Sequence, residues 1–229
     1  MLLINLIALN IKAQDTLKTV TKKDWLTDGV REQFGVLKSD GQTKQGLYKA
    51  IYSPTGAVIA KGKYLNGRKV GIWQFLDINQ RIVEVFDYTR FKLIGEEPVD
   101  ILSKQYINYM FDVKKRDTDR LTKPIRIGGR CFGYIPYLQV FKLSKAYNDY
   151  DSRQLYAHLE LLISPGGRLA DLKVHIITPD GYDNVTSFSP DIFNEEDKQF
   201  IPATFNGKPI MSRIFLVCRV TDSGTLDVN

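Results

Sequence analysis

The chain holds few side chains that could do chemistry, and its two histidines are the first to consider. His158 and His175 lie in two segments that alternate between apolar and polar residues, and Glu160 shares the polar side with His158. Alternation with a period of two predicts strands, and pairing these strands makes the histidines diagonal neighbours on one polar face. Imidazole and carboxylate groups can together bind zinc. Because no metal-ligand spacing accompanies them, we interpret this face as solvated and expect no metal site.

Nucleophilic chemistry has equally little support. Cys218 falls on the apolar side of the last strand, whereas both histidines point to the polar side, so a Cys–His pair does not come within hydrogen-bond reach. The glycine pairs at 128–129 and 166–167 lack the spacing and the Lys-Ser/Thr pair of a phosphate-binding loop. We therefore predict a binding protein that is not an enzyme and takes no cofactor.

We predict that a partner binds to the end of the chain. Residues 200–209 read as a lead-in with a tight turn at Asn206-Gly207, and one strand follows over 210–220. Its apolar face is expected to hold Ile214, Leu216, Cys218 and Val220. Such a strand can leave an open sheet edge, and an open edge accepts an extended peptide. The predicted partner-binding residues are Ile210, Arg213, Phe215, Val217 and Arg219, and the two arginines favour an acidic partner.

The elements that position this strand are predicted as a two-layer α+β domain. Strands over 154–163 and 168–177 form a hairpin around the turn 164–167, with Leu161 facing Ala170 and Leu159 facing Leu172. The closing strand completes a three-stranded antiparallel sheet. Two helices, over 136–147 and 189–199, are expected to cover its apolar face.

The first part of the chain, residues 15–95, reads as a meander of β-hairpins. Strands are predicted at 46–52, 57–64, 71–76 and 82–88, with turns at 53–56 and at Asn66-Gly67. The stretch Gly46-Leu-Tyr recurs as Gly71-Ile-Trp, an offset of about 25 residues that is typical of stacked repeat units.

Three further segments complete the organisation. The stripe of Leu102, Tyr106, Tyr109, Met110 and Val113 has a period of 3.6 and predicts a connecting helix over 98–114. A charged linker at 115–122 follows, with a domain boundary near residue 120, and residues 222–229 are expected to form a tail.

The N-terminus predicts export from the cytoplasm. Leu2 to Leu9 is apolar and Ala13 could precede a cleavage point, so residues 1–13 read as a signal peptide. Because no basic residue stands before the apolar run, we expect that the start is truncated upstream. We expect a periplasmic or secreted protein without a transmembrane segment. In that compartment Cys131 and Cys218 could form a disulfide, and a free buried Cys218 is the favoured alternative. The net charge of +6 is dispersed along the chain, so we expect no nucleic-acid partner.

The stretch Gly62-Lys-Tyr64-Leu-Asn66-Gly67, followed by Gly71-Ile-Trp73-Gln-Phe75 and Asp77, resembles a MORN-type repeat. The usual final turn glycine is replaced by Gln80, and we expect a looser turn there. The resemblance, over residues 30–90, implies β-hairpin units that serve as spacers or docking surfaces.

Residues 123–221 resemble TonB C-terminal domains. The likeness rests on the hairpin around Gly167, on Phe200-Ile-Pro202-Ala203 and on the motif that ends the domain. The motif residues are Pro202, Asn206, Gly207, Lys208 and Pro209. The resemblance implies the fold and a peptide-binding or envelope-binding surface, as in exported proteins of Bacteroidetes-type bacteria.

The favoured function is therefore a non-enzymatic envelope protein that binds a peptide or protein, such as an outer-membrane receptor, through an open sheet edge. A structural homodimer or scaffold, in which that edge pairs with a second copy, is the alternative. An enzyme acting on envelope polymers is a third hypothesis, and it lacks candidate catalytic residues.

Overall fold

A computed structural model describes residues 18–97, 106–147 and 149–228. The predicted signal peptide, the start of the predicted connecting helix and part of the 136–147 to 154–163 connection lie outside these ranges. Strands make up 53% of the chain and helices 8%, so the predicted α+β domain with two covering helices is wrong. The chain forms two compact units, Met1–Glu97 and Pro98–Asn229, called here the N-terminal and C-terminal units.

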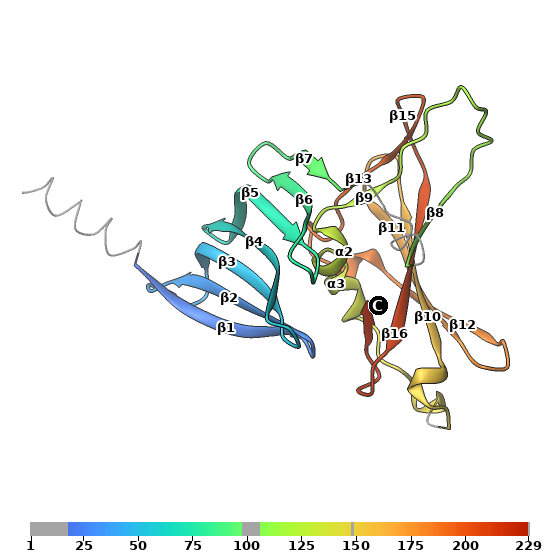
Figure 1. Cartoon of the computed structure of the whole chain (residues 1–229), viewed down its shortest axis with the longest axis horizontal. Helices are drawn as coiled ribbons and strands as arrows, with labels where there is room; N and C mark the ends of the chain where they lie inside the picture. The colour runs from blue at the N-terminus through green and yellow to red at the C-terminus, as the bar shows by residue number, and fades with distance from the viewer. Residues whose placement is uncertain (1–17, 98–105, 148, 229) are drawn as a thin grey trace, which may run out of the picture. The chain divides into compact units, whose positions relative to one another are not determined.

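The N-terminal unit is one antiparallel sheet in which every strand pairs with its neighbours in sequence. Figure 1 shows these strands following one another from blue to green. Their bounds are β1 Thr19–Thr27, β2 Val30–Leu37, β3 Lys44–Tyr52, β4 Ala57–Leu65, β5 Arg68–Leu76, β6 Ile82–Asp87 and β7 Lys92–Glu96. The four strands predicted between residues 46 and 88 are confirmed as β3 to β6.

Turn chemistry explains why this meander forms. Asn66 and Gly67 have φ values of 50° and 78°, the positive values that a two-residue hairpin turn requires. Gln80 takes a φ of 65° at the position where a glycine was expected. Its side-chain amide donates to the carbonyl of Val58 at 3.1 Å. Asp77 accepts from the amides of Asn79 and Arg81, both at 2.9 Å, and so stabilises this turn.

One face of the N-terminal sheet is aromatic and buried. Trp73 is fully buried, with ring centroids 5.2 Å from Tyr48, 5.3 Å from Tyr64 and 5.6 Å from Tyr88. Gly62, directly below, makes this packing possible, because a Cβ there would lie 2.3 Å from the Trp73 ring. Register shifts interrupt all six strand pairs of this sheet. Such bulges bend strands and increase their twist.

The C-terminal unit is built on a sheet whose order is β12-β11-β10-β16-β17, with β8 also paired to β16. The bounds are β8 Ile107–Phe111, β10 Tyr156–Ile163, β11 Leu169–Ile177, β12 Asp183–Phe188, β16 Ser212–Val220 and β17 Leu226–Val228. Two small ribbons complete it: β9 Ile125–Arg126 with β13 Phe200–Ile201, and β14 Ala203–Phe205 with β15 Lys208–Ile210. The expected pairing of β11, β10 and β16 is present, as the centre of a wider sheet.

The predicted hairpin register is displaced by two residues. Leu161 pairs with Leu172 and Leu159 with Val174, so His158 and His175 are directly opposite rather than diagonal. An irregularity at Leu162/Ile163 brings Ile163 opposite Leu169 and absorbs the difference. Because a shift of two keeps the same face, the predicted apolar faces of β10 and β16 are buried. The exception on β11 is Ala170, which is exposed because Leu169 takes its place in the core.

Each predicted helix of this unit is short or absent. Residues 107–111 of the predicted connecting helix form β8, because Ile107, Tyr109 and Phe111 alternate with exposed Asn108 and Met110 and pair with β16. The region predicted helical at 136–147 keeps only α3 Ile135–Leu138 and the 3₁₀ turn η2 Lys145–Tyr147. There the amide of Leu143 donates to the carbonyl of Gly224 at 2.7 Å instead of continuing a helix.

The segment predicted as a helix over 189–199 is the 3₁₀ turn η4 Pro190–Ile192 followed by turns. The contacts of buried Arg126 explain why this segment is not a longer helix. Its guanidinium donates to the carbonyls of Glu196 and Gln199, at 3.4 and 3.0 Å, and pairs with Asp197 at 3.0 Å. The guanidinium also lies 5.4 Å from the Phe200 ring centroid. The remaining elements are α2 Gly129–Phe132 and η3 Ser152–Gln154.

Candidate functional site: the open face of the N-terminal sheet

The strand predicted to bind a partner is not an edge. β16 pairs with β10 along its whole length on one side. Its other side pairs with β8 at Ser212 to Leu216 and with β17 at Cys218 to Val220. The prediction of an open edge over 210–220 is therefore wrong. It failed because the expected connecting helix and the expected tail both supply strands that flank β16.

The predicted partner-binding side chains are engaged within the C-terminal unit. Arg213 pairs with Glu160 at 3.2 Å and with Asp112 at 3.4 Å, and Arg219 pairs with Asp227 at 2.7 Å. The amide of Val217 donates to the carbonyl of Tyr106 at 2.8 Å. Phe215 lies inside the sheet, opposite Glu160 on β10 and Asn108 on β8. Ile210 lies in the small β14–β15 ribbon, opposite Ala203.

The predicted motif residues form a turn and local contacts within the C-terminal unit. Asn206 and Gly207 form the turn of the β14–β15 ribbon, between Phe205 and Lys208, with Pro209 opposite Thr204. The Asn206 side chain accepts from the amide of Arg120 and donates to Asp119, both at 2.9 Å. This hydrogen bond from Asn206 is the main cause of a lowered pKa at Asp119. Pro202 packs closely against Gly167: a Cβ atom added to Gly167 would lie 3.1 Å from the Pro202 ring.

The histidines form part of a charged row on the polar face of the C-terminal sheet. The Nδ1 of His175 lies 3.0 Å from Asp183, and its Nε2 lies 3.1 Å from Glu160. Burial, together with the charge of His175, lowers the pKa of His158, although Asp183 opposes this. Within the described residues, no three His, Cys, Asp or Glu side chains are arranged to hold a metal ion.

Cys131 and Cys218 form no disulfide bond. Cys218 is buried in the core of the C-terminal unit, and burial raises the pKa of its thiol to about 12. A thiol that stays protonated at neutral pH is a poor nucleophile. Cys131, which is half-buried, lies in α2.

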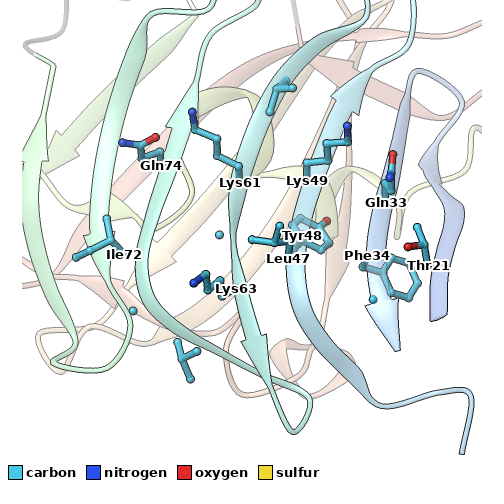
Figure 2. A pocket seen from close by; sticks show the side chains of 15 residues that line it. Thr21, Gln33, Phe34, Leu47, Tyr48, Lys49, Lys61, Lys63, Ile72 and Gln74 are labelled. Carbon is cyan, nitrogen blue, oxygen red and sulfur yellow. The ribbon is translucent and has the colours of Figure 1, made fainter. Parts of the chain in front are cut away.

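The described surface holds a different candidate site on the N-terminal sheet. A groove of about 870 Å³ crosses β1 to β5 on the face opposite to the buried aromatic rings. Figure 2 shows the side chains that line it. We call it the lysine groove, and its principal side chains are Gln33, Leu47, Lys49, Lys61, Lys63, Ile72 and Gln74.

Strand alternation puts these residues on one face. In β3, Leu47 and Lys49 flank buried Tyr48, and in β5, Ile72 and Gln74 flank buried Trp73. Leu47 and Ile72 are exposed to 73% and 47%. They occupy matching places in the repeat that the sequence reveals at Gly46-Leu-Tyr and Gly71-Ile-Trp. Each repeat unit thus supplies a ring to the core and an aliphatic side chain to the groove.

The charges of the groove are unbalanced. Of the described residues that line it, three are lysines and none is acidic. In the described part of the chain no carboxylate pairs with Lys49, Lys61 or Lys63, whereas Lys44 of the same sheet pairs with Glu32 at 2.7 Å. The groove is therefore an unneutralised cationic surface beside two exposed aliphatic side chains.

The sequence predicted β3, β4 and β5, which carry the lysines of the groove, but neither β1 and β2 nor the groove itself. The signal it had was Lys61-Gly-Lys63, two lysines on the same side of one predicted strand. What it lacked was the register that brings Lys49 beside them. No family model, curated protein or solved structure matches this chain. The resemblances to MORN repeats and to TonB C-terminal domains therefore remain predictions.

Proposed function

We propose that this chain is an exported, non-enzymatic protein that binds a partner protein in the lysine groove. The observation that carries the proposal is the pair Leu47 and Ile72, two exposed aliphatic side chains on β3 and β5, the strands on either side of the one that carries Lys61 and Lys63. Exposed apolar side chains gathered in one groove among polar groups are typical of interaction surfaces. Export rests on the apolar N-terminal segment of the sequence.

The dimensions of the groove suit an extended peptide segment. Five adjacent strands at a spacing of roughly 4.8 Å make a surface about 19 Å wide. An extended peptide of about six residues has that length. The buried aromatic layer beneath, with Trp73 fully buried, makes the surface rigid, and a preformed surface lowers the entropic cost of binding.

No helix in the described ranges is long and apolar enough to cross a bilayer.

The homodimer remains the alternative to a partner protein. In the C-terminal sheet, β12 pairs only with β11 and its residues are mostly exposed, so it is the edge that a second copy would use. Light scattering over a range of protein concentrations distinguishes the two: a dimer at all concentrations favours the structural role.

Selection from a random peptide display library against the whole chain tests the proposed function. Peptides enriched on the wild type are expected to bind a Leu47→Ser/Ile72→Ser variant at least tenfold more weakly. An Ile82→Ser/Ile94→Ser variant is the matched control, because these side chains are exposed to 46% and 55% and do not line the groove. Enrichment that is equal on all three proteins, or none at all, would rule the groove out as the binding site.

A further inference from the structure

The strand register arranges the polar side chains of the groove in a line. Gln33 pairs with Lys49, Lys49 with Lys61, and Lys61 with Gln74, across four successive strands. Figure 2 shows these four side chains beside one another in that order. The line therefore runs at right angles to the strands, with two ammonium groups at its centre and an amide at each end.

Two like charges directly opposite each other destabilise a sheet. Lys49 and Lys61 hold this arrangement without a carboxylate to offset it in the described chain. Lysines on the aromatic face of the same sheet have partners within the chain. Lys44 forms an ion pair with Glu32 and lies over the Phe34 ring, and the Lys69 ammonium lies 5.1 Å from the centroid of the Trp73 ring. The unneutralised pair is confined to the open groove, so an anion from outside the chain would relieve it.

The side chains around the two lysines indicate which class of anionic ligand fits the groove. Single-stranded nucleic acids are held by exposed aromatic rings on which bases stack. Among the described residues that line the groove, the aromatic ones are Phe34 and Tyr48, which are only 8% and 4% exposed because their rings belong to the buried face. Leu47 and Lys63 lie opposite each other across β3 and β4, so an apolar contact is available next to each charge. This combination fits an extended polypeptide that presents both acidic and apolar side chains on the same face, at every second residue.

We propose that the lysine groove selects an acidic extended segment of the partner protein, with carboxylates seated over Lys49, Lys61 and Lys63. The proposal rests on the proposed function and specifies its ligand. A peptide that crosses the strands along this line passes over Lys49 and Lys61, whose Cβ atoms are about 5 Å apart on neighbouring strands. Carboxylates at positions i and i+2 of an extended peptide lie on the same side, roughly 6.8 Å apart, and the long lysine side chains span that difference. An apolar residue at position i−2 or i+4 lies on the same side and contacts Leu47 or Ile72.

The test compares two labelled peptides on the whole chain. The probes are fluorescein-Leu-Thr-Glu-Thr-Glu-Thr-Glu, whose leucine and glutamates share one face when the peptide is extended, and the same peptide with glutamine in place of each glutamate. The Kd is measured by fluorescence anisotropy in low salt and in about 150 mM NaCl. We expect the glutamate peptide to bind at least tenfold more tightly in low salt. The preference should weaken with salt, because exposed charges are screened over a Debye length of about 8 Å at that ionic strength.

Variants assign the preference to the lysine pair. In Lys49→Gln/Lys61→Gln the two peptides are expected to bind equally well. Lys38→Gln/Lys92→Gln removes the same charge at exposed positions outside the groove and should keep the tenfold difference. Leu47→Ser/Ile72→Ser should weaken both peptides alike, which reports on the groove as a docking surface and not on its selectivity.

The outcomes separate the two proposals. Equal binding of both peptides to the wild type overturns the acidic selectivity while leaving the docking groove intact. A preference that persists in Lys49→Gln/Lys61→Gln also overturns it, because general charge attraction would then be the cause. Tighter binding of polygalacturonate than of the glutamate peptide, lost in the same variant, would replace the protein segment by an acidic polysaccharide. Failure of both peptides, together with a failed display selection, removes the proposed function itself.

Discussion

The two sheets of this chain are assembled from different kinds of contact. In the N-terminal sheet each strand pairs with the next in sequence, so its topology follows from short turns alone. In the C-terminal sheet the central strand β16 pairs with β8, about a hundred residues upstream, and with β17 just downstream. Local pairing builds the N-terminal sheet without distant segments, whereas distant pairing in the C-terminal unit covers both sides of β16, the strand that was predicted to be an open edge.

The sheets also treat their charges differently. On the polar face of the C-terminal sheet, Glu160 is shared by Arg213 and His175, and His175 also reaches Asp183. In the lysine groove of the N-terminal sheet, Lys49 and Lys61 have no such partners in the described chain. Charges satisfied internally stabilise a fold, whereas unneutralised charges can attract a ligand, so the comparison supports the proposal of recognition on the N-terminal sheet.

The largest difference in stability between the two units is expected when Arg126, whose side chain is 5% exposed, is replaced. Arg126→Met is expected to destabilise the C-terminal unit by about 3–5 kcal/mol, because the partly buried Asp197 and three carbonyls, those of Gly133, Glu196 and Gln199, lose their donor. Hydrogen exchange should accelerate in β10, β11 and β16. Both tryptophans, Trp25 and Trp73, lie in the N-terminal unit, so the fluorescence-detected transition should not move. The exposed Arg116→Met is the control, and an equal loss there would contradict the argument.

The next largest effect tests the N-terminal sheet alone. Gly62→Ala places a methyl group 2.3 Å from the Trp73 ring, and overpacking of this kind costs about 3 kcal/mol. The denaturant midpoint followed by tryptophan fluorescence should fall, and peptide binding in the groove should weaken with it. Gly95→Ala, on β7, has open space around its Cβ position and should leave the midpoint within experimental error.

A pH-dependent effect is expected at the β5–β6 turn. Burial alone would raise the pKa of Asp77, but hydrogen bonds from the Arg81 backbone and side chain outweigh it and lower the pKa below the ordinary 3.8. A carboxyl with a lowered folded-state pKa contributes stability above its unfolded pKa and loses it as the pH falls through the folded value. Asp77→Asn should therefore cost about 1.5 kcal/mol at pH 7, and the difference from the wild type should shrink below about pH 4. Denaturant titrations at pH 7 and pH 3 measure it, and a difference that is constant with pH would argue against the charge.

The smallest effect has the opposite sign. Lys61→Gln removes the like-charge contact with Lys49 and should stabilise the ligand-free N-terminal unit by about 0.3 kcal/mol, while it weakens binding of the glutamate peptide. Thermal unfolding monitored by tryptophan fluorescence in low salt detects the gain. Loss of stability in this variant would mean that the lysines are held by contacts within the chain, and the contrast between the two sheets would disappear.

The comparison also explains which predictions succeeded. The alternation in 154–163, the Asn-Gly turns and the repeat at Gly46 and Gly71 depend on neighbouring residues, and the structure has them as predicted. The helices failed because their apolar stripes are satisfied by distant partners: Ile107 pairs with Leu216, and the segment after Asn194 is held by Arg126. A stripe shows which residues are buried, but in short segments it does not decide between helix and strand.

The sequence by itself determined the strands β3 to β6, the Asn-Gly turns and the apolar sides of β10 and β16, because these follow from local backbone preferences and from the period of the side chains. Only the tertiary structure decided that β16 is central, that Arg126 organises the C-terminal loops and that Lys49 lies beside Lys61. Those facts depend on which strands pair and in which register, and pairing joins residues that no local pattern connects.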